Sequence, residues 1–166
     1  NFLPRLLKIP LFSAFDVSQP EDKEILKKLY ESFSTKNFKK GKIIINEGEE
    51  GDIFYILHSG KVHIFRNTLS GDQISLAHLS SEQNISFGET ALIGLDTRTA
   101  SIMAESDCST INLSGNDFHK LCEKYPVLGY KVLRQLSTKL LKTVNELNKD
   151  KAALYETLFD EIGNID

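Results

Sequence analysis

Hydrophobic residues keep a helical spacing near the start of the chain and then switch to short runs. Ser18 and Glu21 have the Ser-x-x-Glu spacing that predicts a capping box. The hydrophobic residues that follow fall on one face of a helix: Ile25, Leu26, Leu29, Tyr30 and Phe33. We therefore expect an amphipathic helix within an N-terminal helical segment, residues 1–41.

The middle of the chain, residues 42–113, has short apolar runs separated by glycines and by clusters of Asn, Asp and Ser. The runs are 43–45, 53–57, 62–65, 74–79, 101–104 and 110–113. Runs of this length and spacing predict short antiparallel strands in a barrel or a sandwich. The predicted fold class is therefore mainly β with added α-helices.

Helical spacing returns in residues 114–166. Ser114 stands three residues before Asp117 and predicts the start of a helix that Pro126 ends. A long second helix should run from Val127 to about Phe159, with leucines every seven residues: Leu133, Leu140, Leu147 and Leu154. We expect its first half to cover the strands and its second half to pair with a second copy. Packing of the whole leucine stripe on the chain's own strands is the alternative.

Length and charge limit the function classes. With 166 residues, 40% of them hydrophobic, the chain can bury one core and is too short for two ordinary domains. A net charge of −3 gives no extended field for nucleic acid or an anionic membrane, so any anion site must be local. Two cysteines without a CxxC spacing favour a reducing cytoplasm, and no apolar run is long enough to span a membrane.

Candidate chemistry is concentrated in residues 87–101. Gly88 can turn sharply into one helical turn, whose free N–H groups form an anion site. Arg98 adds a fork of donors suited to two phosphate oxygens, and Glu89 is better suited to accept from a sugar hydroxyl than to face an anion. A cyclic nucleotide carries both groups. Taken singly, Gly88 could serve a turn, and Glu89 and Arg98 could form a surface ion pair.

The same residues carry a resemblance to a known family. Phe87-Gly88-Glu89, Ala91 and Arg98-Thr99-Ala100 resemble the phosphate-binding cassette of cyclic nucleotide-binding domains. The glycine-punctuated segment 47–62 is also similar to that family, and the resemblance runs from about Leu11 to the 140s. It implies an antiparallel β-roll of the jelly-roll kind, with an N-terminal helix, a short helix in the cassette and two C-terminal helices.

The resemblance also implies roles for individual residues. Arg98 would pair with the cyclic phosphate, Glu89 would accept from the ribose 2′-hydroxyl, and the backbone N–H groups of Ala91 and Thr99 would reach phosphate oxygens. Thr143 on the long helix would contact the base. The complete expected ligand site is Phe87, Gly88, Glu89, Thr90, Ala91, Arg98, Thr99, Ala100 and Thr143.

We therefore expect a sensor module, not an enzyme, that needs no cofactor or metal and signals through the long helix. Cyclic AMP is favoured over cyclic GMP because it is commoner in the family, although the Thr99 hydroxyl resembles a residue that favours guanine. An effector domain or protein beyond this chain would receive the signal. Only about twenty residues follow Thr143, too few for a DNA-reading helix-turn-helix.

Two other interpretations stay open. A module of the same fold that has lost nucleotide binding would serve only protein association. A cupin-type metal enzyme, which we favour least, would use His58 or His63 together with Glu47 or Glu89, because histidine and carboxylate are common metal ligands.

Overall fold

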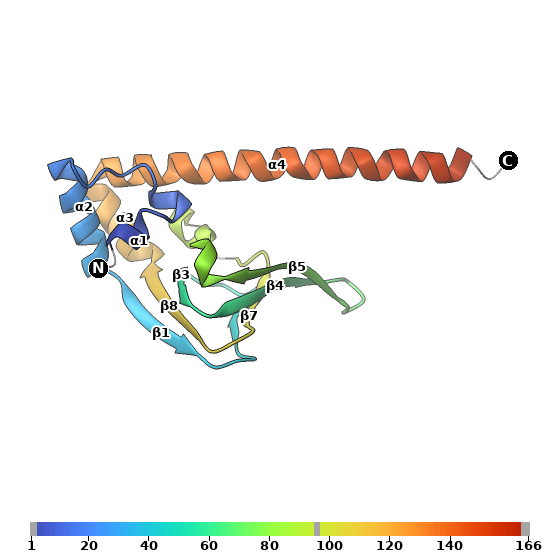
Figure 1. The fold of residues 1–166 in the computed structure, drawn as a ribbon, viewed down its shortest axis with the longest axis horizontal. Coiled ribbons are helices and arrows are strands. Elements are labelled where there is room, and N and C mark those ends of the chain that lie inside the picture. Colours follow the sequence, from blue (N-terminus) through green and yellow to red (C-terminus); the bar gives the residue numbers. More distant parts are fainter. Residues whose placement is uncertain (1–2, 95–96, 164–166) are drawn as a thin grey trace.

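Two antiparallel sheets occupy the middle of the chain in a computed structural model that describes residues 3–94 and 97–163 (Figure 1). Leu95 and Asp96, which fall inside the expected cassette, lie outside the described residues. One sheet has the strand order β1-β8-β3-β6 and the other has β2-β7-β4-β5. The predicted mainly β fold is confirmed: the described strands form a two-sheet β-roll that is not joined into one closed barrel.

Most strands coincide with the apolar runs of the sequence. Their bounds are β1 (Ser34–Phe38), β2 (Ile43–Ile45), β3 (Ile53–Ser59), β4 (Lys61–Asn67), β5 (Gln73–Ser80), β6 (Ser86–Phe87), β7 (Ser101–Ala104) and β8 (Cys108–Ser114). The apolar pattern did not predict β1 or β6. β1 is a largely exposed edge strand of polar sequence that pairs with β8, and it lies within the segment expected to be helical.

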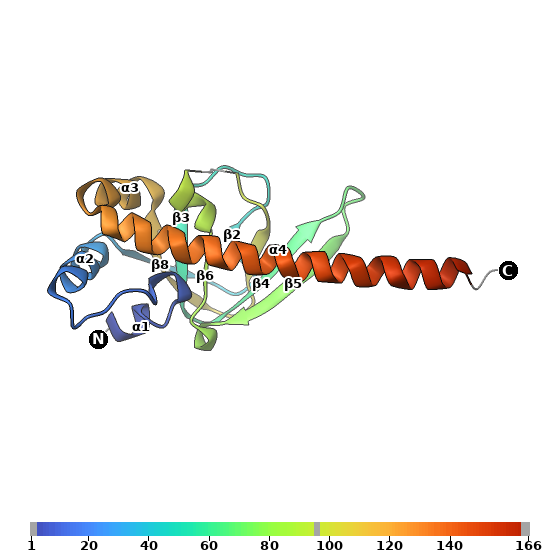
Figure 2. The ribbon, with the colours of Figure 1, turned by 90° about the horizontal axis from the view of Figure 1, so that it is seen from above.

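Helices gather at one side of the roll (Figures 1 and 2). The N-terminal ones are α1 (Leu3–Leu6), η1 (Pro10–Phe12) and α2 (Pro20–Glu31), and the C-terminal ones are α3 (Gly115–Lys124) and α4 (Pro126–Gly163). Two short 3₁₀ helices, η2 (Ser81–Gln83) and η3 (Glu89–Ile93), interrupt the strands. No helix among residues 3–94 and 97–163 has the length and apolar character needed to cross a membrane.

The ends of the helices test the capping predictions. The capping box at Ser18 is wrong: α2 begins after Gln19 with Pro20 in its first turn, and the Ser18 N–H instead bonds to the Asp16 carboxylate at 2.9 Å. A proline already fixes the helical φ and has no N–H to cap, so the box is not needed. The Ser114 cap is confirmed, because its hydroxyl accepts from the Asp117 N–H at 3.0 Å.

Two hydrophobic clusters hold the fold together. The larger one joins the helices to the outer face of the sheet that contains β3 and β8, and it includes Phe12, Phe54, Phe118 and Leu128. The smaller one fills the interior of the roll, where Tyr55 stacks on Phe87 at a ring distance of 5.3 Å. The base of α4 is therefore part of the main core.

Only the first part of α4 packs on the rest of the chain. Leu128, Val132 and Leu136 are buried at a spacing of four residues, whereas Leu147 and Leu154 of the sevenfold stripe are exposed. Figure 1 shows α4 crossing above the roll and continuing well past it. The expectation that only the first half covers the roll is confirmed, although the residues that pack are not those of the stripe.

An ion pair ties the base of α4 to α2. The Lys131 ammonium lies 2.7 Å from Asp22 Oδ1, and the Asp16 N–H donates to Asp22 Oδ2 at 2.8 Å. Lys131 also sits 4.9 Å from the centre of the Phe15 ring. Because Asp22 is buried, removal of Lys131 would leave a buried carboxylate without its ammonium partner.

Truncation of Leu128 should therefore destabilise the whole chain. Leu128→Ala removes a fully buried side chain and should lower the free energy of unfolding by about 2 to 5 kcal/mol. Leu141→Ala, on the same helix at 65% exposure, should change it by less than about 0.5 kcal/mol. Urea unfolding of both variants measures the difference, and equal effects would show that α4 is not anchored in the core.

Candidate functional site

A cavity of about 450 Å³ lies between the roll and α4. Most of the predicted ligand residues line it: Phe87, Gly88, Glu89, Thr90, Arg98, Thr99, Ala100 and Thr143. Its remaining lining is largely aliphatic and comes from the strands, η3 and α4: Ile45, Ile64, Ile93, Ile102, Leu136 and Leu140, with Lys139 beside them. The structure therefore brings a polar end and an apolar wall together in one cavity.

The polar end begins with a left-handed turn at Gly88. Gly88 has φ +77° and precedes η3, and Gly94 follows the end of η3 with φ +71°. A Cβ at Gly88 would lie 2.8 Å from the Ile53 carbonyl oxygen and 3.0 Å from Arg98 Nη1. Glycine is required for both the backbone angle and the close approach. The short helix predicted in the cassette is confirmed, as a 3₁₀ helix.

Arg98 is held in a fixed position at the cavity wall. Its Nη1 donates to the Gly88 carbonyl at 3.2 Å and to the Thr90 hydroxyl at 3.3 Å, while Nη2 donates to the Ile53 carbonyl at 2.7 Å. Only 6% of the residue is exposed. The surface ion pair considered for Arg98 and Glu89 is therefore wrong, because the guanidinium is buried and these three oxygens orient it.

The loop between β2 and β3 holds the backbone of Arg98. The Gly48 N–H donates to the Arg98 carbonyl at 2.8 Å, and the Arg98 N–H donates to the Glu49 carbonyl at 3.0 Å. A Cβ at Gly51 would lie 2.9 Å from Arg98 Nε, so the guanidinium packs directly on this glycine. The sequence marked this loop only by its glycines and did not assign Gly51 to the site.

Glu89 faces α4. Its carboxylate accepts from the Lys139 ammonium in an ion pair that joins the cassette to the long helix. The sequence analysis did not assign Lys139. The signal that could have found it is helical spacing, because Leu136, Lys139, Leu140 and Thr143 share the i, i+3, i+4, i+7 face of one helix.

One predicted residue does not line the cavity. Ala91 is buried in η3, and its N–H donates to the Gly88 carbonyl at 3.2 Å. A Cβ at Gly115 would collide with the Ala91 carbonyl, so α3 starts directly against the cassette. The contact requires glycine at position 115, and the phosphate contact expected of the Ala91 N–H stays a prediction.

The pKa of Tyr55 depends on burial and on charged residues next to the site. Burial raises the pKa of Tyr55, and the nearby positive charge of Arg98 opposes this shift while the negative charge of Asp52 adds to it. The Tyr55 hydroxyl therefore stays neutral at physiological pH, and its ring serves as a support for Phe87.

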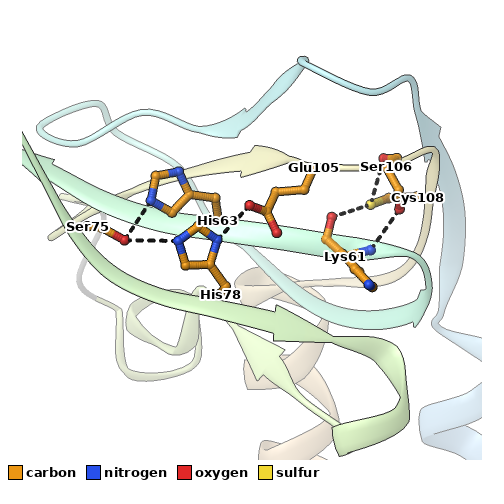
Figure 3. A network of polar contacts seen from close by, with 7 residues as sticks. All are labelled: Lys61, His63, Ser75, His78, Glu105, Ser106 and Cys108. Carbon is orange, nitrogen blue, oxygen red and sulfur yellow. Dashed lines mark hydrogen bonds and ion pairs between the residues drawn. The ribbon is translucent and has the colours of Figure 1, made fainter.

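The histidines considered as metal ligands have other partners. His63 and His78 stack with ring centres 4.3 Å apart, and both bond to the Ser75 hydroxyl (Figure 3). His78 also bonds to Glu105 at 2.5 Å, a partner that the sequence did not indicate. In the described part of the chain no group of three or more His, Cys, Asp or Glu side chains is placed to hold a metal ion.

The other residues considered for that metal site each have a different partner. His58 bonds to Arg5, Glu47 bonds to Arg66 at 2.7 Å, and Glu89 pairs with Lys139. Hydrogen bonds from the Asn67 N–H and from Arg66 lower the pKa of Glu47, which favours the ionised carboxylate. The geometry gives no support to a cupin-type site.

Comparison with known proteins agrees with the geometry. The family model of the cyclic nucleotide-binding domain matches residues 35–125. Human cGMP-dependent protein kinase 2 is 39% identical over 114 residues, which cover 64% of this chain and 14% of the kinase. The cyclic AMP receptor protein of Thermus thermophilus is 30% identical over 116 residues, which cover 70% of this chain and 53% of that protein.

A solved structure gives the same result for the fold. The catabolite activator protein of Thermus thermophilus superimposes with a TM-score of 0.68 and 28% identity, covering 86% of this chain and 63% of that one. In each of these comparisons the matched region spans less than two thirds of the relative's own length. The similarity therefore concerns one domain of larger proteins.

Substitution of Gly88 should disturb the cassette more than substitution of another glycine with positive φ. Gly88→Ala should lower the free energy of unfolding by about 2 to 4 kcal/mol, because strain and a backbone collision add. Gly71→Ala, at φ +91° with no atom within 4 Å of the added Cβ, should cost only about 1 kcal/mol. Denaturant unfolding measures the loss of stability in both variants. Equal losses would mean that the Ile53 carbonyl can move away from the added Cβ at no measurable cost.

Proposed function

The chain belongs to the cyclic nucleotide-binding domain family, and we propose that its cavity binds a cyclic nucleotide as the input of a regulatory module. The observation that carries this proposal is the buried Arg98 guanidinium at the wall of a 450 Å³ cavity. A buried, oriented guanidinium beside an open cavity is suited to an anionic ligand.

The proposed ligand fits the two ends of the cavity. The cyclic phosphate would lie against Arg98 and the Thr99 N–H, and the ribose 2′-hydroxyl would donate to Glu89. The base would lie against aliphatic side chains such as Ile64 and Leu140, because a flat ring gains most from apolar contact. Thr143, one turn after Lys139 on α4, would contact the edge of the base.

We propose cyclic AMP as the preferred nucleotide. Similar proteins include both a cGMP-dependent kinase and a cyclic AMP receptor protein, so both ligands are chemically reasonable. The exposed Thr99 lines the cavity, and a hydroxyl at this position could also serve a guanine. Titration with both nucleotides decides between them.

The output is proposed to run through α4. Leu136, Lys139, Leu140 and Thr143 of this helix line the cavity, so a ligand contacts the helix directly. A ligand shifts the position of α4 only if it binds one arrangement of the helix better than another. We propose that the chain itself performs no catalysis and passes the signal to an effector beyond it.

A second copy is the proposed partner of the free half of α4. Leu147, Leu154 and Leu158 are exposed along the same helix, and a stripe of this kind is stabilised by a partner helix. We also keep a cytoplasmic location in the proposal, because Cys108 and Cys122 are both free. The alternative, a module used only for association, would keep this stripe and bind no nucleotide.

Binding of cyclic nucleotides should depend on Arg98. Arg98→Ala should weaken binding by about 2 to 5 kcal/mol, because it removes the buried charge that faces the phosphate. Arg98→Lys keeps a positive charge without the fork and should lose at least about tenfold in affinity. Isothermal titration calorimetry with cyclic AMP and cyclic GMP measures both effects.

Arg134→Ala provides the control for that titration, because Arg134 is exposed on α4 and does not line the cavity. Its affinity should equal that of the unaltered chain. Wild-type protein that binds neither nucleotide would favour the association module, whereas binding that survives Arg98→Ala unchanged would place the phosphate elsewhere.

Pairing of the chain should depend on the second half of α4. Leu154→Glu places a charge in the stripe and should convert a dimer to a monomer in sedimentation velocity experiments. Lys149→Glu, which changes charge two residues after Leu147 and off the stripe, should leave the dimer intact. A wild-type chain that stays monomeric as its concentration rises would contradict the proposed pairing.

A further inference from the structure

We infer that Lys139 is a third charged residue of the ligand site, which neutralises Glu89 and makes anion binding depend on the position of α4. The inference rests on the proposed nucleotide function. Its starting observation is the Lys139–Glu89 ion pair, which spans from the helix to the cassette at the cavity. None of the residue roles assigned above explains why a lysine stands there.

The charges of the cavity explain the need for Lys139. Among the described residues, the charged side chains that line it are Glu89, Arg98 and Lys139. Repulsion between Glu89 and a cyclic monophosphate opposes the attraction by Arg98, and it would be larger if Glu89 had no lysine beside it. Lys139 offsets the charge of Glu89 and so favours a ligand that carries a negative charge.

The geometry allows Glu89 to serve two partners. A carboxylate has two oxygens and accepts several hydrogen bonds, and Lys139 occupies Oε1. The Glu89 side chain is 19% exposed, so it remains accessible from the cavity. A ribose hydroxyl can therefore bond to the same carboxylate while the lysine stays in place.

Because Lys139 lies on α4, its positive charge reaches the cavity only while the helix is in place. If α4 moves away, the ammonium leaves with it and the charge of Glu89 is no longer offset. A phosphate then binds the closed helix better than the displaced helix, which is the difference in affinity that coupling requires. The ion pair thus links an electrostatic preference for the ligand to the position of the helix.

Calorimetric titration of matched variants tests the inference. Lys139→Met keeps the length of the side chain without its charge and should weaken cyclic AMP binding by about two- to fivefold, the range expected for a half-exposed pair. Lys139→Arg should recover most of that loss. Lys142→Met, on an exposed position of α4 outside the cavity, should bind as the wild type does.

The cyclic 2′-deoxy analogue of AMP separates charge from sugar recognition, since it lacks the hydroxyl that Glu89 would bind. Lys139→Met should weaken binding of this analogue, and the double variant Glu89→Gln with Lys139→Met should restore it, because both charges of the pair are then absent and no unopposed carboxylate remains. A merely structural role for Lys139 would not produce that recovery. The loss should also shrink as salt concentration rises.

Two results would overturn the inference. Equal or tighter cyclic AMP binding by Lys139→Met would show that the lysine competes with the ribose for Glu89. Absence of recovery in the double variant would show that charge is not the cause. Wild-type protein that binds no nucleotide would instead refute the proposed function, so the two failures are distinguishable.

Discussion

The site depends on one constraint, the burial of the positive charge of Arg98. A guanidinium at 6% exposure must be surrounded by acceptors, since a buried charge without them costs several kcal/mol. The carbonyls of Gly88 and Ile53 meet that need only because the chain turns left-handed at Gly88 and leaves room at Gly51. The cavity wall is therefore part of the fold and not an addition to it.

Helix α4 is held to the rest of the chain by three contacts, of which the last is the most exposed. Lys131 meets the buried Asp22 of α2 at the base of the helix, Leu136 packs in the main core five residues later, and Lys139 meets Glu89 at the edge of the cavity. Beyond Lys139 the helix is exposed among the described residues. The cavity reaches Leu136 and Lys139 and does not reach Lys131, so a ligand in it would contact the helix beyond its anchored base.

Sequence patterns predicted those parts of the fold that show in local spacing. Alternating apolar residues revealed strands such as β4, but the polar edge strand β1 is formed by pairing with β8, a distant contact that no local pattern records. Eight of the nine expected ligand residues line the cavity: seven come from the cassette, and the eighth is Thr143. Ala91 does not line the cavity: it is buried in η3, and its carbonyl lies against Gly115 of α3. Lys139 was missed because its role depends on where α4 lies over the cassette.

The arrangement also determines how strongly a ligand can act on the helix. A ligand shifts an equilibrium only by its difference in affinity for the two states. In the proposed function, Leu136 and Leu140 would cover the base, and the ion pair between Lys139 and Glu89 would favour the closed helix before any ligand enters. Part of the closing free energy would then be present in advance, so ligand affinity would rise while the ligand-induced movement would become smaller. A stronger, more deeply buried pair would hold the helix closed with and without ligand and would transmit less of the signal.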